Sequence, residues 1–418
     1  MNKQILFSAI LSLLVMAACT EEKQRPVIEF DFGNPTQSGS RYPSLHYTDD
    51  GSLFMSWLSR IDEEFYALAF SEYKDGRWDP PQTVHVGTDF FANWADFPSV
   101  VAMEGEVTAL HWLKKIEGGP YAYNVQIAFP GRDGERWTHI TPHLDGTPTE
   151  HGFVSMKPLS PDRVLAIWLD GRHTHSRGHD QYFDLELAMT LRSAIVGADG
   201  SIEFKRVVDE AVCDCCQTDL AMIDGGAIAV YRDRNEHEIR DISYVIYDLE
   251  TNRWSEPASI HDDGWEIAAC PVNGPRVAVS GNEIAVVWYT EAGENKQVKA
   301  SFSTDGGESF SDPIRLGTHR VIGRVDVVAS PENGFYAVWK EQDGSMARIY
   351  LQKLGDGRHL TEPIYIGSTD VGRSSGFPRI AATSEGLVLA YTQTEPHTRI
   401  RTALYRYEND DRFPAEES

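Results

Sequence analysis

Basic residues are scarce in this chain of 418 residues: 38 lysines and arginines stand against 63 aspartates and glutamates, giving a formal net charge of −25. Such a charge is repelled by phosphate backbones and anionic headgroups, which argues against nucleic acid or an anionic membrane surface as a partner. Long apolar runs are lacking too, because residues 5–16 are far too few to span a bilayer as a helix. The five cysteines are too few for a disulfide-dependent scaffold.

Apolar residues, by contrast, are present in ample supply. They make up 41% of the chain, and ten of them are tryptophans, which is enough for a packed core. The length alone suggests two or three domains, but closed all-β folds run long as single domains.

The N-terminus has the pattern of a bacterial lipoprotein signal peptide. Lys3 supplies a positive charge, residues 5–16 form the apolar stretch, and small residues precede Cys19, which resembles a lipobox. We expect residues 1–18 to be removed, Cys19 to be lipidated and residues 19–26 to form a polar tether. An ordinary signal peptide with a chance cysteine is the alternative. The expected product is a monomer in the cell envelope, held only by its lipid at the periplasmic face or the cell surface of the outer membrane.

A repeated pair of apolar runs dominates the rest of the chain. Each copy starts with a small residue and often a proline, and each often ends in an aromatic residue. Alternation with a period of two, interrupted by turns rich in Asp and Gly, indicates strand hairpins rather than helices. Seven copies occur, at residues 41–57, 97–112, 152–168, 218–231, 271–288, 323–339 and 377–391.

A second kind of turn follows the first six copies. Residues 303–310 read Ser-x-Asp-x-Gly-x-x-Phe, a complete Asp box, and weaker versions occur elsewhere. In such a turn the Asp carboxylate accepts backbone N–H groups, a glycine takes a positive φ, and the aromatic ring fills the gap between neighbouring sheets. The turns therefore mark the outer edges of successive blades.

These repeats predict an all-β fold: a single β-propeller of four-stranded antiparallel blades, in which radial repetition protects the sheet edges. The seventh unit has no fourth strand of its own, and we expect the unpaired run at residues 27–32 to complete it and close the ring. Seven blades are expected, with six blades and an irregular extension as the alternative. We expect residues 27–408 to form the propeller and residues 409–418 to form a disordered acidic tail.

Four cysteines lie in loops that the repeat places at one end of neighbouring blades. Cys213, Cys215 and Cys216 enter the fourth blade, and Cys270 enters the fifth. Outside the cytoplasm, four cysteines usually form two disulfides. Three or four thiolates on adjacent loops equally suit Cu(I) or tetrahedral zinc. A redox-active pair is the third possibility.

The loop between the second and third strands of blade three is expected on the same face. It carries His173, His175 and His179, three imidazoles within seven residues. Such a group can ligate a metal, or it can be an ordinary solvated loop.

The equivalent loop of blade four is dense in charge. It is either an anion-binding patch or an ion-pair network that holds the loop. With this loop, the possible ligand face also includes Asn273 next to Cys270 and two arginines at other blade entries. Its members are Arg232, Asp233, Arg234, His237, Arg240, Asn273, Arg41 and Arg324.

The Asp boxes resemble those of the BNR-repeat sialidase superfamily, and the resemblance covers nearly the whole mature chain. Two segments in particular, Cys-Asp-Cys-Cys-Gln-Thr at 213–218 and Cys-Pro-Val-Asn-Gly-Pro at 270–275, resemble a subfamily of bacterial lipoproteins often labelled exo-α-sialidase. This resemblance implies a fold more than a function.

Sialidase chemistry would require three arginines to hold the sugar carboxylate, a Tyr–Glu pair and an Asp acid/base. Residues 41–43 are similar to the family's Arg-Ile-Pro, and further clamps could come from Arg234 or Arg240, Arg324 and Arg373. However, the proline recurs at other blade entries, and seven blades depart from the six of sialidases. We therefore do not expect sialidase activity.

A polysaccharide lyase is the remaining enzymatic alternative, since a His or Tyr base and an arginine that neutralises a uronate would suffice. The candidate bases are His151, His173, His175, Tyr182 and Tyr231. We expect instead a binding module built around the four cysteines, with a copper or zinc ion, a small ligand or a glycan as its partner.

Overall fold

The computed structural model describes residues 28–407, apart from Asp31, Asp49 and residues 132–135, 178–183, 332–333 and 356–360. The predicted signal peptide and tail lie outside the described residues, as do three named candidates, Cys19, His179 and Tyr182. No described helix is long and apolar enough to cross a membrane.

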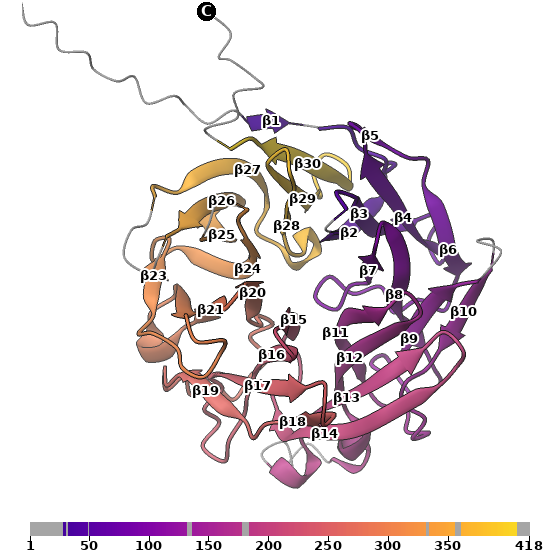
Figure 1. Cartoon of the computed structure of the whole chain (residues 1–418), viewed down its shortest axis with the longest axis vertical. Helices are drawn as coiled ribbons and strands as arrows, with labels where there is room; N and C mark the ends of the chain where they lie inside the picture. The colour runs from indigo at the N-terminus through magenta and orange to yellow at the C-terminus, as the bar shows by residue number, and fades with distance from the viewer. Residues whose placement is uncertain are drawn as a thin grey trace, which may run out of the picture.

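Seven antiparallel sheets are arranged in a ring around a central axis, and the chain passes once around it (Figure 1). In blades one and four the outermost strand is broken into two pieces that pair with the same neighbour. Blade one holds β2 (Ser40–Tyr47), β3 (Leu53–Arg60), β4 (Tyr66–Lys74), β5 (Arg77–Trp78) and β6 (Gln82–Gly87). Blade two holds β7 (Ser99–Met103), β8 (Glu106–Lys115), β9 (Tyr123–Pro130) and β10 (Trp137–Ile140).

Blades three and four lie at the lower right and bottom of the ring in Figure 1, and blade five follows on the left. Blade three holds β11 (His151–Ser160), β12 (Arg163–Asp170), β13 (Met189–Gly197) and β14 (Ile202–Val212). Blade four holds β15 (Asp219–Ile223), β16 (Gly226–Arg232), β17 (Ile242–Asp248), β18 (Arg253–Trp254) and β19 (Ala258–His261). Blade five holds β20 (Arg276–Ser280), β21 (Glu283–Thr290), β22 (Gln297–Ser303) and β23 (Ile314–Leu316).

The last two blades bring the chain back to its start. Blade six holds β24 (Val321–Ala329), β25 (Phe335–Asp343), β26 (Met346–Leu354) and β27 (Ile364–Asp370). Blade seven holds β28 (Arg379–Ala382), β29 (Leu387–Gln393), β30 (Arg399–Tyr405) and β1 (Ile28–Phe30). Short 3₁₀ turns occur at η1 (Arg172–Ser176), η3 (Leu185–Leu187), η4 (Ala292–Glu294) and η5 (Arg373–Ser375).

The ring closes as predicted. Strand β1 pairs antiparallel with β30, with Ile28 opposite Tyr405, so the N-terminal strand supplies the fourth strand of the last blade. This confirms seven blades and excludes the alternative of six.

Large aromatic residues near the end of each second strand form the core between blades. Five of the seven are tryptophans, at most 2% exposed, and each indole N–H has a polar side-chain partner. For example, Trp339 donates to Glu341 at 3.0 Å. Burying rings of this size supplies much of the hydrophobic free energy of a blade. The equivalent residues are Trp57, Trp112, Trp168, Tyr231, Trp288, Trp339 and Tyr391.

The complete Asp box adopts the geometry expected from its sequence. Asp305 accepts the backbone N–H of Ser309 at 3.0 Å, and Gly306 has a φ of 75°. Phe310 packs edge-on against Tyr244 of the preceding blade, with the ring centroids 5.0 Å apart. The turn therefore links blades four and five.

Candidate functional site

A tight turn between β14 and β15 brings three cysteine sulfurs together. The backbone N–H of Cys213 bonds to Arg232 O at 3.0 Å, which ties the loop to the next blade. The chain then turns at residues 214–215, leaving the Sγ atoms of Cys213 and Cys216 only 3.3 Å apart. With Cys215, all three sulfurs lie within 4.8 Å of one another and could hold a metal ion.

Cys270 comes from the loop that enters the neighbouring blade, and it does not belong to the group of three sulfurs that lie within 4.8 Å of one another. Hydrogen bonding with Cys213, Cys216 and Cys270 raises the pKa of the Cys215 thiol, so Cys270 interacts with the group. Cys213 and Cys216 are buried, Cys215 is half-buried and Cys270 is exposed. None of these four described cysteines is in a disulfide.

Buried arginines and carboxylates surround the sulfurs. Arg240 Nη1 lies 3.5 Å from Cys213 Sγ, and its Nη2 lies 2.6 Å from Glu238. Arg234 binds Glu238 at 2.7 Å and approaches Asp214 at 3.5 Å. The charged loop of blade four is therefore the ion-pair network that was one of its two expected roles.

The histidine loop of blade three also reaches this cluster, but through an arginine. Arg177 binds Asp214 at 3.0 Å. His173 and His175 are exposed, and they belong to neither of the metal-capable groups found among the described residues. Arg177 of this loop therefore lies beside the cysteine turn, but no imidazole of the described part of the loop joins the sulfurs.

The environment of Cys213 favours a thiolate. Burial opposes the charged form, but hydrogen bonds from Cys215 and Cys216 and the nearby guanidinium of Arg240 hold the pKa of Cys213 well below its usual range. In tetrahedral zinc–thiolate geometry, with bonds of about 2.3 Å, neighbouring sulfurs lie about 3.8 Å apart. Small side-chain adjustments would bring the three sulfurs to that spacing.

A second metal-capable group consists of His143, Asp145 and His151. The backbone N–H of Val125 donates to His143 Nε2 at 3.1 Å, so Nδ1 carries the ring proton and faces Asp145 at 3.6 Å. Arg172 occupies the same carboxylate at 3.3 Å. These contacts form a hydrogen-bonded ion-pair cluster that could also hold a metal ion.

Asp96, Tyr123 and Glu150 form a buried group that the sequence analysis did not identify. Tyr123 Oη lies 2.5 Å from Glu150 and 3.3 Å from Asp96. Burial raises the pKa of Asp96 to about 8 and that of Glu150 to about 7. A single phenolic proton cannot satisfy two carboxylates, so one carboxyl is expected to be protonated at neutral pH. No sequence motif marks these residues, because they meet only through the packing of blades two and three.

Two residues of the expected ligand face instead fasten blades together. Arg232 is 2% exposed and donates to three backbone carbonyls. Asn273 accepts the N–H of Arg324 at 2.8 Å and donates to Ile322 O at 3.2 Å. The polar groups of Arg232 and Asn273 are used in these bonds between blades. These bonds are a structural reason for polar residues at these two positions.

The remaining members of the expected face are dispersed. Asp233 accepts from Ser243 at 2.9 Å, and burial raises its pKa to about 6. His237 is exposed, and half-buried Arg41 bonds to the backbone at Gly39.

The arginines considered for a sialidase clamp lie in two places on the propeller. Arg324 is 5% exposed, donates to Ser375 Oγ at 2.9 Å and lies over the ring of Trp94. Arg373 lies near the same ring, whereas Arg234 and Arg240 belong to the cysteine cluster. The candidate arginines therefore fall into two groups, one beside Trp94 and one beside the cysteines.

Two of the proposed lyase bases are buried, and each is hydrogen-bonded to an aspartate. Tyr231 donates to Asp209 at 2.6 Å, and burial raises its pKa. His151 is fully buried, with Nε2 3.1 Å from Asp145.

Comparison with known proteins identifies the fold and no family. No protein-family model matches the chain, and no curated protein does. An ulvan lyase solved with -[GlcA(1-4)Rha3S]- aligns at 11% identity with a TM-score of 0.54, over 91% of this chain and 96% of that chain. A protein of unknown function from Dyadobacter fermentans aligns at 12% identity with a TM-score of 0.51, over 92% and 99%.

A Hadza microbial sialidase also aligns, at 12% identity with a TM-score of 0.45, over 88% of this chain and 66% of that chain. At these identities the likeness establishes the propeller fold alone. The function must be argued from this chain's own residues.

Proposed function

We propose that this protein is a metal-binding propeller that holds one soft ion, Cu(I) or Zn²⁺, at Cys213, Cys215 and Cys216, with Cys270 as the fourth ligand. The observation that carries the proposal is the convergence of three sulfurs within 4.8 Å in a turn between two blades. Thiolates are the ligands that Cu(I) and tetrahedral zinc prefer.

The charges around the sulfurs support this proposal. Three arginines, Arg177, Arg234 and Arg240, face two carboxylates, Asp214 and Glu238. A metal–thiolate group would place net negative charge next to these three arginines, which favours it electrostatically, whereas two disulfides would be neutral.

Exposure of the sulfurs is graded in a way that suits ion transfer. Two sulfurs are buried, Cys215 is intermediate and Cys270 is exposed. An ion arriving from solvent would meet Cys270 first and pass to the buried sulfurs by ligand exchange. With the predicted lipid at Cys19, the protein would bind its ion in the cell envelope.

Thiol counting and metal analysis test the proposal on protein exported to the periplasm and purified without chelator. We expect four reactive thiols after denaturation and about one equivalent of copper or zinc, lost in the Cys213→Ser and Cys216→Ser variants. A matched control replaces the exposed His173 and His175 with alanine and should keep the metal.

The disulfide alternative predicts a different result. Absence of thiols and of metal in the wild-type protein would show that the cysteines are bridged, and it would refute the proposal. Metal retained by both cysteine variants would refute the assigned ligands.

A further inference from the structure

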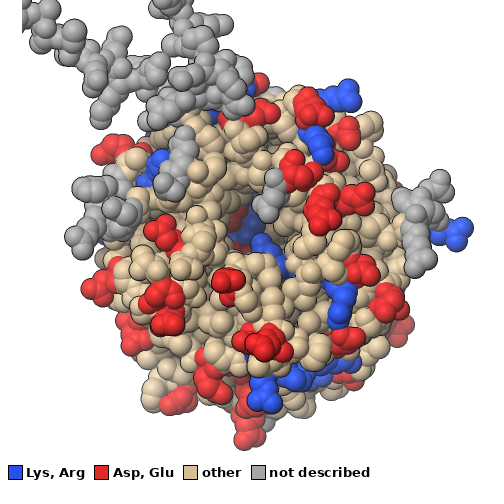
Figure 2. All heavy atoms as spheres, viewed as in Figure 1, with Lys and Arg blue, Asp and Glu red and all other residues tan. Residues whose placement is uncertain are grey.

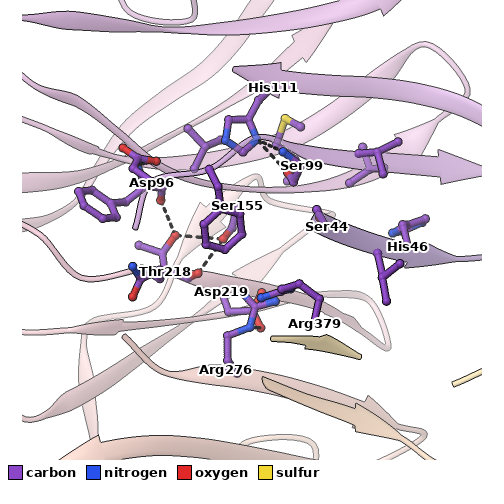
Figure 3. Close-up of a pocket in the computed structure, with 18 of the residues that line it drawn as sticks. Ser44, His46, Asp96, Ser99, His111, Ser155, Thr218, Asp219, Arg276 and Arg379 are labelled. Carbon is purple, nitrogen blue, oxygen red and sulfur yellow. Dashed lines mark hydrogen bonds and ion pairs between the residues drawn. The ribbon is translucent and has the colours of Figure 1, made fainter. Parts of the chain in front are cut away.

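The propeller axis contains a polar cavity of about 90 Å³ that is separate from the cysteine cluster. Innermost strands of several blades line it, and the space-filling view shows a hollow at the ring centre with basic side chains inside (Figure 2). Three basic residues contribute to its lining: Lys157, Arg276 and Arg379. In Figure 3 the side chains of Arg276 and Arg379 lie beside each other, next to Asp219.

The strand register explains why these charges meet. Each blade has one first-strand residue that faces the axis. Its partner on the second strand is the residue just before the buried aromatic. These equivalent positions therefore form one ring around the axis. The ring contains Ser44, Ser99, Ser155, Asp219, Arg276, Asp326 and Arg379.

Carboxylates pair with only part of the two guanidinium groups. Arg276 Nε lies 3.2 Å from Asp219 and 3.0 Å from Asp326. Arg379 Nε lies 3.3 Å from the same Asp326. Asp219 and Asp326 also accept hydrogen bonds from backbone N–H groups, at 2.9 and 3.0 Å. Part of the hydrogen-bonding capacity of the two carboxylates is therefore already used.

Several donors facing the cavity lack a partner. Within the described part of the chain, Lys157 Nζ and the terminal guanidinium nitrogens of Arg276 and Arg379 make no hydrogen bond to a protein group, and Arg379 Nε is buried without a hydrogen-bond partner. Arg379 is 7% exposed, whereas Lys157 and Arg276 are half-buried. Holding three cations this close together in a partly desolvated cavity is costly, and a bound anion would offset the cost.

The balance of charge in the cavity is positive. Burial lowers the pKa of Lys157; with this lysine protonated, Lys157, Arg276 and Arg379 carry three positive charges, and Asp219 and Asp326 supply two negative charges. Asp96 also lines the cavity, but burial raises its pKa to about 8, so it is mostly neutral at pH 7. The nearby His46 is neutral at pH 7, because burial and the charge of Lys157 lower its pKa to about 4. One positive charge therefore remains in a chain whose net charge is −25.

We propose that this cavity binds a small oxyanion, held by Lys157 Nζ and the free guanidinium nitrogens of Arg276 and Arg379. Guanidinium groups match the planar or tetrahedral oxygens of carboxylate, sulfate and phosphate. A water requires about 10–15 Å³ of such volume, so the space admits several waters or one small anion. Serine hydroxyls at Ser44 and Ser99 complete the polar wall.

The site does not depend on the cysteines, since none of them lines the cavity. The inference therefore stands or falls independently of the proposed metal centre.

Anion binding can be measured on the purified full chain by calorimetry and by thermal unfolding in sulfate, phosphate or acetate, with sodium chloride at equal ionic strength as reference. We expect sulfate or phosphate to raise the unfolding temperature if the site takes a tetrahedral anion, and acetate to do so if it takes a carboxylate. The Lys157→Met variant should bind the effective anion at least tenfold more weakly.

A matched control, Arg315→Met, removes an exposed arginine of β23 and should leave the affinity unchanged. Lys157→Met keeps the side-chain length and removes a half-buried charge, so it is expected to fold. Arg379→Gln provides a second variant with the same expected loss. Stabilisation no greater than that in sodium chloride, or equal anion affinity in wild type and both variants, would overturn the proposal and leave a water-filled channel.

Discussion

Replacing Arg232 by lysine tests whether this residue fastens blades rather than binding a ligand. Its guanidinium donates to Asn273 O at 2.9 Å, Tyr289 O at 2.6 Å and Arg240 O at 2.5 Å. It also lies over the ring of Trp265, 4.7 Å from the centroid. A single ammonium group cannot reach all three carbonyls, which come from blades four and five.

The cost follows from the bonds that are lost. A hydrogen bond to a charged group contributes about 1.5–3 kcal/mol, and a buried carbonyl left without a donor costs about 1–3 kcal/mol. If lysine keeps one of the three contacts, two carbonyls lose their donor, and we expect a loss of about 3–5 kcal/mol in unfolding free energy.

Denaturant unfolding of the variant measures this loss. The matched control is Arg253→Lys, because Arg253 is an exposed arginine of the same blade, and a change within about 0.5 kcal/mol is expected there. Metal content should be unchanged in Arg232→Lys once it is folded. A decrease in the free energy of unfolding of less than about 1 kcal/mol would refute the role of Arg232 in joining the blades. Arg232 would then again be a candidate ligand-binding residue.

Three further predictions follow from the packing and the buried acids. A Cβ at Gly274 would lie 1.9 Å from Gln217 O. Gly274→Ala should therefore lower the free energy of unfolding by about 1–3 kcal/mol and reduce metal retention. A variant as stable as the wild type would contradict this prediction. Burial raises the pKa of Asp96 to about 8, so the contribution of Asp96 to folding stability is full below pH ~4 and is lost as the pH rises through 8. The denaturant midpoints at pH 5 and pH 8 should therefore differ more in the wild type than in Asp96→Asn. An equal difference in the two proteins would contradict the assignment. Phe310→Ala removes a half-buried ring that joins two blades and should cost about 2 kcal/mol, measured by denaturation against wild type, with an effect below about 0.5 kcal/mol contradicting the Asp-box packing.

The fold was predictable because its signals repeat in the sequence. An aromatic residue recurs at the end of each second strand, and the Asp box at residues 303–310 lies at the matching place in its repeat. The register of the repeats placed the loops of Cys213 and Cys270 at one end of adjacent blades. Closure by residues 28–30 followed from counting strands. Periodic patterns of this kind survive in a single sequence because every blade must bury the same faces.

The polar partners could not be predicted in the same way. Asp96, Tyr123 and Glu150 come from three separate loops and strands and share no motif. The charges of Arg276 and Arg379 look like ordinary strand residues until the register places both on the axis. Arg232 and Asn273 looked like ligand-binding residues, because a sequence does not reveal that a backbone carbonyl of another blade takes up each donor.

X-ray absorption at the copper or zinc edge of the protein as purified tests the metal site most directly. The account predicts a first shell of three or four sulfurs, at about 2.3 Å for zinc, that collapses in the Cys213→Ser variant. A first shell of nitrogen and oxygen alone, with intact masses showing two disulfides among Cys213, Cys215, Cys216 and Cys270, would contradict the proposed thiolate centre.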